Sequence, residues 1–181
     1  DNTPPSVSLT SPNGGEDWKA GSTHTVTWIA TDAVGVTGVD LAWSGDDGAT
    51  YPNAIALGLA NGGSYGWLVP NVPGSNVRVR ATARDAANNA VSDASNTSFT
   101  ISRWQITASA GSGGSVSPSG TVGIAQGGSV IYDIAPASGF GVGDVLVDGG
   151  SVGAVSAFTF SNVTANHTLV AAFADIASPS V

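Results

Sequence analysis

The chain has 181 residues, a formal charge of −8 from 13 acidic and 5 basic side chains, and no cysteine. The negative charge would repel a phosphate backbone, so we expect no nucleic-acid partner. The absence of cysteine excludes disulfide scaffolds and thiolate metal sites. No apolar run is long enough to span a bilayer, so we expect no transmembrane segment.

Low charge, many hydroxyl side chains and no oxidisable Cys or Met suit an extracellular or cell-surface location. Helix-forming residues are scarce, and short runs of Val, Ile, Thr and aromatic residues recur between turns rich in Gly, Asn and Pro. This composition predicts an all-β fold. Because the sequence begins at Asp1 and contains no Met, we expect a processed product or an excised fragment.

The first hundred residues contain many short segments in which apolar and polar residues alternate. Seven or more short strands in about 100 residues is typical of an immunoglobulin-like (Ig-like) antiparallel β-sandwich, which we assign to residues 1–102. The residues expected to face inward are Val7, Leu9, Val26, Trp28, Val39, Leu41, Trp43, Tyr65, Trp67, Val69, Phe99 and Ile101.

Residues 77–89 hold the clearest alternation in the chain. The small apolar residues at every second position are expected to face the core, and the polar residues between them to face outward. The outward set includes three arginines, which we expect to pair with nearby carboxylates. The inward set is Val77, Val79, Ala81 and Ala83, and the outward set is Arg78, Arg80, Thr82 and Arg84.

A boundary is predicted near Ser102 and Arg103, because the chain beyond it has no Lys or Arg and only four acidic residues. Alternating segments then resume, which predicts a second small antiparallel β domain at residues 103–175 and a tail or linker at 176–181. Trp104 directly follows the boundary, and we expect it to pack between the two units. The inward residues of this second domain include Ile106, Ala108, Val130, Tyr132, Ile134, Phe158, Phe160, Leu169, Ala171 and Phe173.

Several motifs resemble known families. The runs SPNGGEDW from Ser11, VTW from Val26, SGDDG from Ser44 and GSYGWLVP from Gly63 resemble Ig-like domains appended to secreted bacterial hydrolases and cell-surface proteins. The second half is similar to bacterial extracellular β-repeats of the internalin B-repeat-like group. That similarity is carried by Gly139-Phe140, VDG from Val147, FSNVT from Phe160 and NHT from Asn166. Both resemblances imply accessory modules with varied duties.

No arrangement of residues indicates catalysis, so we expect that the protein is not an enzyme. His24 and His167 fall in different domains, and no acid and nucleophile accompany either one in a recognisable triad. The chain has one Glu, and the adjacent Asp46 and Asp47 lie in a predicted turn rather than in a cleft.

A calcium site is the one metal site that the sequence predicts. Calcium prefers six to eight oxygen ligands, and Asp85 with Asn88 and Asn89 supplies several within one turn. Asp32 and Asp1 are expected to join from neighbouring segments. Related Ig-like domains carry a similar Asp-rich loop at the domain end, so the resemblance implies the same role here. The alternative is that Asp85 only caps its own turn or pairs with Arg84.

Asn88 is a departure from related domains, which often carry Asp-Ala-Ala-Gly-Asn in this loop. We expect the loop to survive, because Asn tolerates a positive φ angle.

Two functions remain open at this stage. The first is a non-catalytic structural or adhesive module, such as a spacer, a surface anchor or a subunit of an extracellular assembly. Its partners would be neighbouring domains of a longer chain or other copies of itself. The alternative is a carbohydrate-binding accessory module of a secreted polysaccharide- or protein-degrading enzyme. Trp18 and Tyr51 are the aromatic residues least constrained by alternation, and we expect them to contact such glycans.

Overall fold

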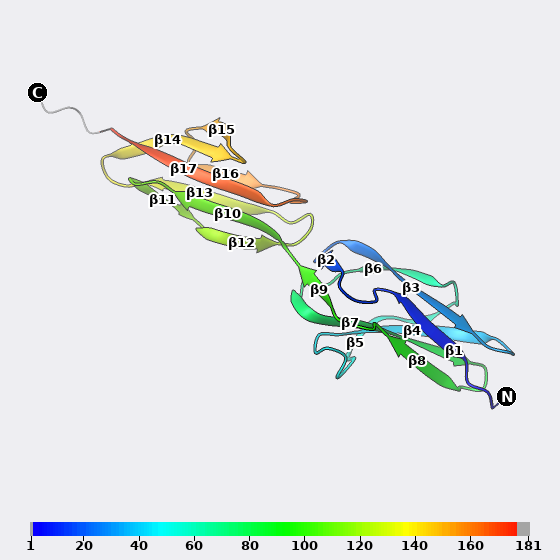
Figure 1. Cartoon of the computed structure of the whole chain (residues 1–181). Helices are drawn as coiled ribbons and strands as arrows, with labels where there is room; N and C mark the ends of the chain where they lie inside the picture. The colour runs from blue at the N-terminus through cyan, green and yellow to red at the C-terminus, as the bar shows by residue number, and fades with distance from the viewer. Residues whose placement is uncertain (1, 177–181) are drawn as a thin grey trace, which may run out of the picture. The chain divides into compact units, whose positions relative to one another are not determined.

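The computed structural model describes residues 2–176, and these form strands, turns and loops without any helix. The all-β prediction is therefore confirmed. The chain divides into two compact units, 1–102 and 103–181, named unit 1 and unit 2 (Figure 1). No helix in the described part of the chain is long and apolar enough to cross a membrane.

Unit 1 consists of two sheets whose inner faces supply one core. The smaller sheet has the order β1-β3-β6; the larger has the order β2-β9-β7-β4-β5, with β8 also paired to β7. The pairs are antiparallel except β2 with β9. The strands are β1 (Ser6–Ser11), β2 (Asp17–Lys19), β3 (Thr23–Thr31), β4 (Val36–Ser44), β5 (Asn53–Leu59), β6 (Ser64–Leu68), β7 (Gly74–Asp85), β8 (Ala90–Ala94) and β9 (Phe99–Ser102).

The core of unit 1 follows the predicted alternation closely. The four small apolar residues of β7, from Val77 to Ala83, are all buried, as the sequence predicted. Trp67 lies at the centre of an aromatic group, with its ring centroid 6.0 Å from that of Trp18, 6.3 Å from Trp43 and 6.5 Å from Phe99. Tilted and edge-on ring pairs at such distances add stability beyond the burial of their area.

Unit 2 also has two sheets, with the orders β12-β10-β17-β14-β15 and β11-β13-β16. Its first and last strands, β10 and β17, are parallel neighbours, and the other pairs are antiparallel. The strands are β10 (Trp104–Ala110), β11 (Gly114–Ser117), β12 (Gly120–Ile124), β13 (Val130–Pro136), β14 (Phe140–Val147), β15 (Gly150–Gly153), β16 (Ala157–Phe160) and β17 (His167–Asp175).

Two features of unit 2 bear on the sequence predictions. The Trp104 ring is half-buried against the core of unit 2, where its indole Nε1 donates to Gln126 Oε1 at 2.6 Å. Packing of Trp104 between the units stays a prediction. The predicted tail at 176–181 lies outside the described residues apart from Ile176, whose N–H donates to the Gly139 carbonyl at 2.9 Å.

Tyr132 is the largest fully buried side chain of the protein's described part, and its ring meets Phe160 edge-on at 5.9 Å. The phenolic oxygen is buried without a hydrogen-bond partner. Burial raises the pKa of this phenol, so the group is neutral at physiological pH. A buried hydroxyl without a partner loses its hydration and gains nothing in return.

We therefore expect Tyr132→Phe to raise the free energy of unfolding of unit 2 by about 1 kcal/mol, because the ring is kept and the unpaired hydroxyl is removed. Tyr132→Ala, the matched loss of the ring, should lower it by about 3–5 kcal/mol. Denaturant unfolding of the three proteins measures both changes. A loss of stability in Tyr132→Phe would contradict the assignment of an unpaired hydroxyl.

Candidate functional site

The residues predicted to bind calcium are brought to one end of unit 1 by strand pairing. The start of β1 lies beside the end of β3, with Ser6 opposite Thr31, and the start of β4 lies beside the end of β7, with Val36 opposite Asp85. Loop 32–35 joins these two places. The leading segment, this loop and the β7–β8 turn therefore share one end of the sandwich (Figure 1).

Asp85 is buried at this end, with only 2% of its surface exposed. Its carboxylate accepts hydrogen bonds from the N–H groups of Ala87 (2.9 Å) and Asn89 (2.8 Å) and from Asn89 Nδ2 (2.6 Å). The bond from the Asn89 side chain is the main cause that lowers the pKa of Asp85. Asp85 thus caps its own turn, as the alternative interpretation held, while Arg84 pairs with Asp40 at 3.2 Å.

Asn88 has a φ of 64°, the left-handed conformation that Asn adopts more readily than most residues. The expectation that this turn survives without glycine is therefore confirmed.

Asp32 lies in the adjoining loop and has one unsatisfied oxygen. Its Oδ1 accepts from the N–H groups of Val34 (2.9 Å) and Gly35 (2.8 Å). Its Oδ2 is buried and has no hydrogen-bond partner. A buried carboxylate oxygen needs a donor or a cation, so Asp32 is the residue of this end whose surroundings fit an ion.

The other predicted ligands contribute less. Asp1 lies outside the described residues. Within residues 2–176, no group of three or more His, Cys, Asp or Glu side chains is placed to hold a metal ion. An ion at this end would therefore depend on Asp32 and Asp85 together with amide and backbone carbonyl oxygens, the ligand types that calcium accepts.

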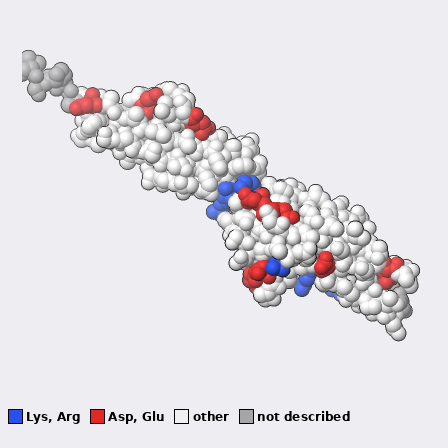
Figure 2. All heavy atoms as spheres, viewed as in Figure 1, with Lys and Arg blue, Asp and Glu red and all other residues white. Residues whose placement is uncertain are grey.

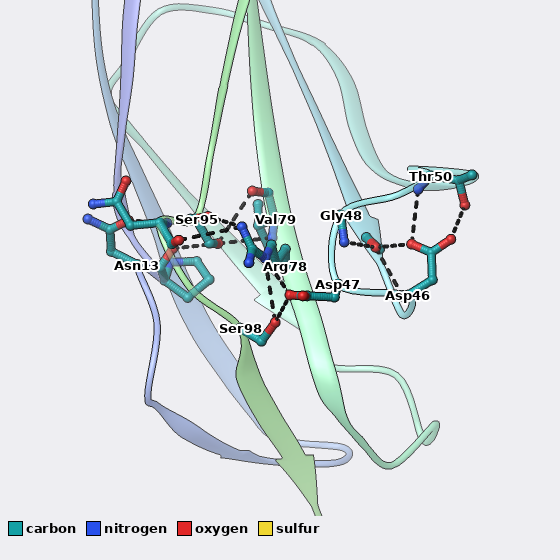
Figure 3. A network of polar contacts seen from close by, with 12 residues as sticks. Asn13, Asp46, Asp47, Gly48, Thr50, Arg78, Val79, Ser95 and Ser98 are labelled. Carbon is teal, nitrogen blue, oxygen red and sulfur yellow. Dashed lines mark hydrogen bonds and ion pairs between the residues drawn. The ribbon is translucent and has the colours of Figure 1, made fainter.

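The opposite end of unit 1 carries a polar network around the β4–β5 turn (Figure 3). Asp46 accepts from Ser44 Oγ, from the Thr50 N–H at 3.0 Å and from Thr50 Oγ1 at 2.6 Å. These bonds, led by the one from Ser44, lower the pKa of Asp46 from 3.8 to about 2. The carboxylate is therefore a cap for its own turn.

Asp47 and Ser95 extend this network to the neighbouring strands. Asp47 pairs with Arg78 at 2.8 Å and accepts from Ser98, which lowers the pKa of its carboxyl. The buried Ser95 hydroxyl donates to the Pro12 carbonyl at 2.8 Å and accepts from the Val79 N–H at 3.0 Å. Asp47 thus joins the β4–β5 turn to β7 and to the chain between β8 and β9, and Ser95 joins that same segment to β7 and to the chain after β1.

Of the two aromatic residues predicted to face glycans, Trp18 is not exposed, so that prediction is wrong. The Trp18 ring is 7% exposed and stacks on the His24 imidazole, with centroids 4.5 Å apart and planes 3° apart. The reason is that β2 pairs with β9, which places Trp18 opposite Ile101 and turns its ring into the core. Tyr51 is half-buried, with the guanidinium carbon of Arg80 4.4 Å from its ring centroid.

The two histidines have structural neighbours. The His24 imidazole is partly buried against the Trp18 ring. This burial lowers the pKa of His24, which favours the neutral imidazole. His167 Nδ1 lies 2.7 Å from Asp148 Oδ2, and this contact is the main cause that lowers the pKa of Asp148.

Comparison with known proteins supports the class of unit 1. Residues 5–72 match the model of a family described as a bacterial Ig domain. This match spans β1 to β6 and agrees with the observed sandwich, so it supports a bacterial Ig-like domain in unit 1. Similarity of unit 2 to the internalin B-repeat-like group stays a prediction.

Two solved structures were found as similar to this chain, both at low identity. One holds fibronectin(III)-like modules of Clostridium thermocellum CbhA, with 13% identity, a TM-score of 0.39 and 94% of each chain covered. The other is a chimeric titin Z1Z2 functionalised with a peptide from decorin, with 11% identity, a TM-score of 0.31, and 92% of this chain and 94% of that chain covered. A search of curated proteins gave no match.

The lowered pKa of Asp46 makes the stability of unit 1 depend on pH. Because the folded pKa of about 2 lies below the ordinary value of 3.8, ionisation of Asp46 stabilises the fold above about pH 4. This contribution is lost as the pH falls from about 4 to about 2. We expect the melting temperatures of wild type and Asp46→Asn to differ by a constant amount above pH 5 and to converge below pH 4.

Thermal melting from pH 7 to pH 2, followed by circular dichroism, measures this convergence. Asp133→Asn in unit 2 serves as the control for a lost carboxylate outside the network. A difference between wild type and Asp46→Asn that stays constant down to pH 2 would show that the carboxylate is not held in its charged form.

Proposed function

We propose that the chain is a non-catalytic structural module of an extracellular or cell-surface protein, where it acts as a spacer or anchor between neighbouring domains or copies. The observation that carries this proposal is the path of the chain through each unit. In both units the chain enters at one end of the sandwich and leaves at the other.

In unit 1 the strand pairing defines this path. The chain enters at the end shared by Ser6 and Asp85, and β7 then spans the sandwich from Gly74 to that end. The chain leaves along β9, where Ile101 lies opposite Gly74. At about 3.3 Å per residue, the 12 residues of β7 span about 36 Å, so the entry and exit points of the unit are held far apart.

In unit 2 the parallel pairing of β10 and β17 has the same result. Ile106 lies opposite His167, and Ala110 lies opposite Ala171. The first strand begins and the last strand ends at opposite ends of the unit, which suits a module placed in series with others.

The surface also supports a structural role. Figure 2 shows one face on which acidic and basic atoms form small separate groups within a largely uncharged surface. The Asp and Arg residues of the β4–β5 turn network are held by bonds within the fold. The similarity of unit 1 to bacterial Ig-like domains also agrees with a structural role, because such domains serve as accessory modules.

Calcium at the Asp32–Asp85 end is the second part of the proposal. The buried Oδ2 of Asp32 supports it, since a cation would supply the missing partner. An ion there would join loop 32–35 to the β7–β8 turn at the end where the chain enters unit 1. Such a contact would stiffen a series of modules.

We expect millimolar calcium to stabilise unit 1 by about 1–2 kcal/mol relative to chelator, as for an extracellular site with a dissociation constant of about 10⁻⁴–10⁻³ M. Asp32→Asn is the sharpest variant, because its amide oxygen can still accept from Val34 and Gly35 while the second carboxylate oxygen is lost. It should abolish the effect of calcium and leave stability in chelator unchanged or higher.

Thermal melting of wild type, Asp32→Asn and Asp85→Ala in excess calcium and in chelator measures the effect. Asp133→Asn is again the control and should respond as wild type does. Equal melting temperatures of wild type in calcium and in chelator would remove calcium from the proposal and leave the spacer role untouched.

A further inference from the structure

The outer face of β7 carries three arginines, and one of them is left without a carboxylate. Arg78 pairs with Asp47 at 2.8 Å, and Arg84 pairs with Asp40 at 3.2 Å. Arg80 lies between them and makes neither an ion pair nor a hydrogen bond within residues 2–176. The expectation that all three arginines meet carboxylates is therefore wrong for Arg80, although acidic residues outnumber basic ones 13 to 5.

Packing rather than ion pairing holds the Arg80 side chain in place. Its guanidinium lies over the Tyr51 ring at 4.4 Å, a cation–π contact, and its Nε is buried without a partner. The terminal nitrogens stay reachable by solvent. Arg80 thus presents a fixed planar cation whose outer N–H groups lack acceptors.

The neighbours of Arg80 on the sheet leave this cation uncovered. Ala42 of β4 and Ala94 of β8 lie directly opposite it on its two sides, and a methyl group cannot reach over a guanidinium. In the next row of the same face, the hydroxyls of Thr82 and Ser92 are 2.8 Å apart. The surroundings are therefore small, polar and uncharged.

We propose that Arg80 and Tyr51 form a binding site for the carboxylate of an acidic sugar, that is, for a uronic-acid residue of a glycan. A planar guanidinium binds a planar carboxylate through two parallel hydrogen bonds, which a lysine cannot reproduce. Burial raises the pKa of the Tyr51 phenol, so at neutral pH the hydroxyl of the ring that packs against Arg80 is an intact donor for a sugar oxygen.

The form of the site favours a sugar over a peptide. An extended peptide binds most readily along a sheet edge, where unpaired backbone groups are available. Arg80 lies on β7, which is paired with β4 on one side and with β8 and β9 on the other, so its backbone has no free edge at this position. The face offers side-chain donors and part of an aromatic ring, which are the groups that recognise sugars.

This proposal is independent of the spacer role and of calcium, and its test uses the full chain. The probe is an α-1,4-linked galacturonic acid trimer, titrated by calorimetry at low salt in the presence of chelator. Its methyl ester, which has the same sugar rings without the charges, is the matched control ligand. Triglutamate supplies carboxylates without a sugar.

We expect the trimer to bind wild type and the methyl ester to bind at least about tenfold more weakly. Arg80→Gln and Arg80→Lys should each weaken trimer binding by about tenfold, and Tyr51→Leu should weaken it as well. Arg84→Gln, which removes an ion-paired arginine of the same face, should change the affinity less than twofold. Added salt should weaken binding, because the site is exposed to solvent.

The proposal is overturned if the trimer does not bind wild type, or if Arg80→Lys binds it as tightly as wild type. Triglutamate binding as tight as that of the trimer would also overturn it and assign the site to peptide carboxylates. Circular dichroism checks that the variants fold. Arg80→Lys keeps the charge and most of the aliphatic stem, so it preserves the test if Arg80→Gln is unstable.

Discussion

The hydrogen bonding of β7 to strands on both of its sides is the constraint on which unit 1 depends. β7 pairs along most of its length with β4, and its other side is shared between β9 at the start and β8 at the end. Strict alternation along β7 then determines which side chains lie on its buried face and which lie on its outer face. One face gives four fully buried apolar side chains, of which the two valines each stabilise the fold by roughly 1–3 kcal/mol. A shift of the register by one residue would bury three arginines instead.

The two ends of β7 differ in how their polar groups are satisfied. At one end, the carboxylates of Asp46 and Asp47 are met by hydroxyls, N–H groups and Arg78, so the network is complete within the fold. At the other end, Asp85 is satisfied by its own turn, whereas one oxygen of Asp32 is buried without a partner. The face between these ends repeats the contrast, since Arg78 and Arg84 are paired and Arg80 is not. Unsatisfied charged groups are uncommon in folded proteins, so these two positions are where a ligand has most to contribute.

Long alternating segments made much of the fold predictable from the sequence. Trp28, Trp67 and the inner residues of β7 are buried as the alternation predicts. Trp18 was not predictable in this way, because β2 has only three residues and its inward direction comes from pairing with β9, which lies more than 80 positions later. The parallel pairing of β10 with β17 has no local signal either, and the prediction of a second small antiparallel domain did not include it.

The candidate sites were likewise predictable only where a local segment of the sequence determines them. The turn at Asp85 is encoded locally, and Asn88 takes the predicted positive φ angle. The isolation of Arg80 is not encoded locally, because it depends on which carboxylates the register of β4 and the β4–β5 turn brings to its two neighbours. Asp40 and Asp47 reach Arg84 and Arg78, and the residues across from Arg80 are alanines. Which arginine lacks a carboxylate is therefore decided by strand register, which the sequence of β7 alone does not contain.

The parallel pairing of β10 and β17 has a mechanical consequence. If the chain is pulled from both sides of unit 2, the tension enters at the start of β10 and leaves at the end of β17. These strands are direct neighbours, paired from Ile106 and His167 to Ala110 and Ala171, so they are loaded in shear along their length. Hydrogen bonds that lie across the pulling direction must then break together, whereas a hairpin pulled from its open end loses them one at a time. Resistance to force is governed by the rate of unfolding rather than by the equilibrium free energy. Unit 2 can therefore hold under load better than its small core would suggest.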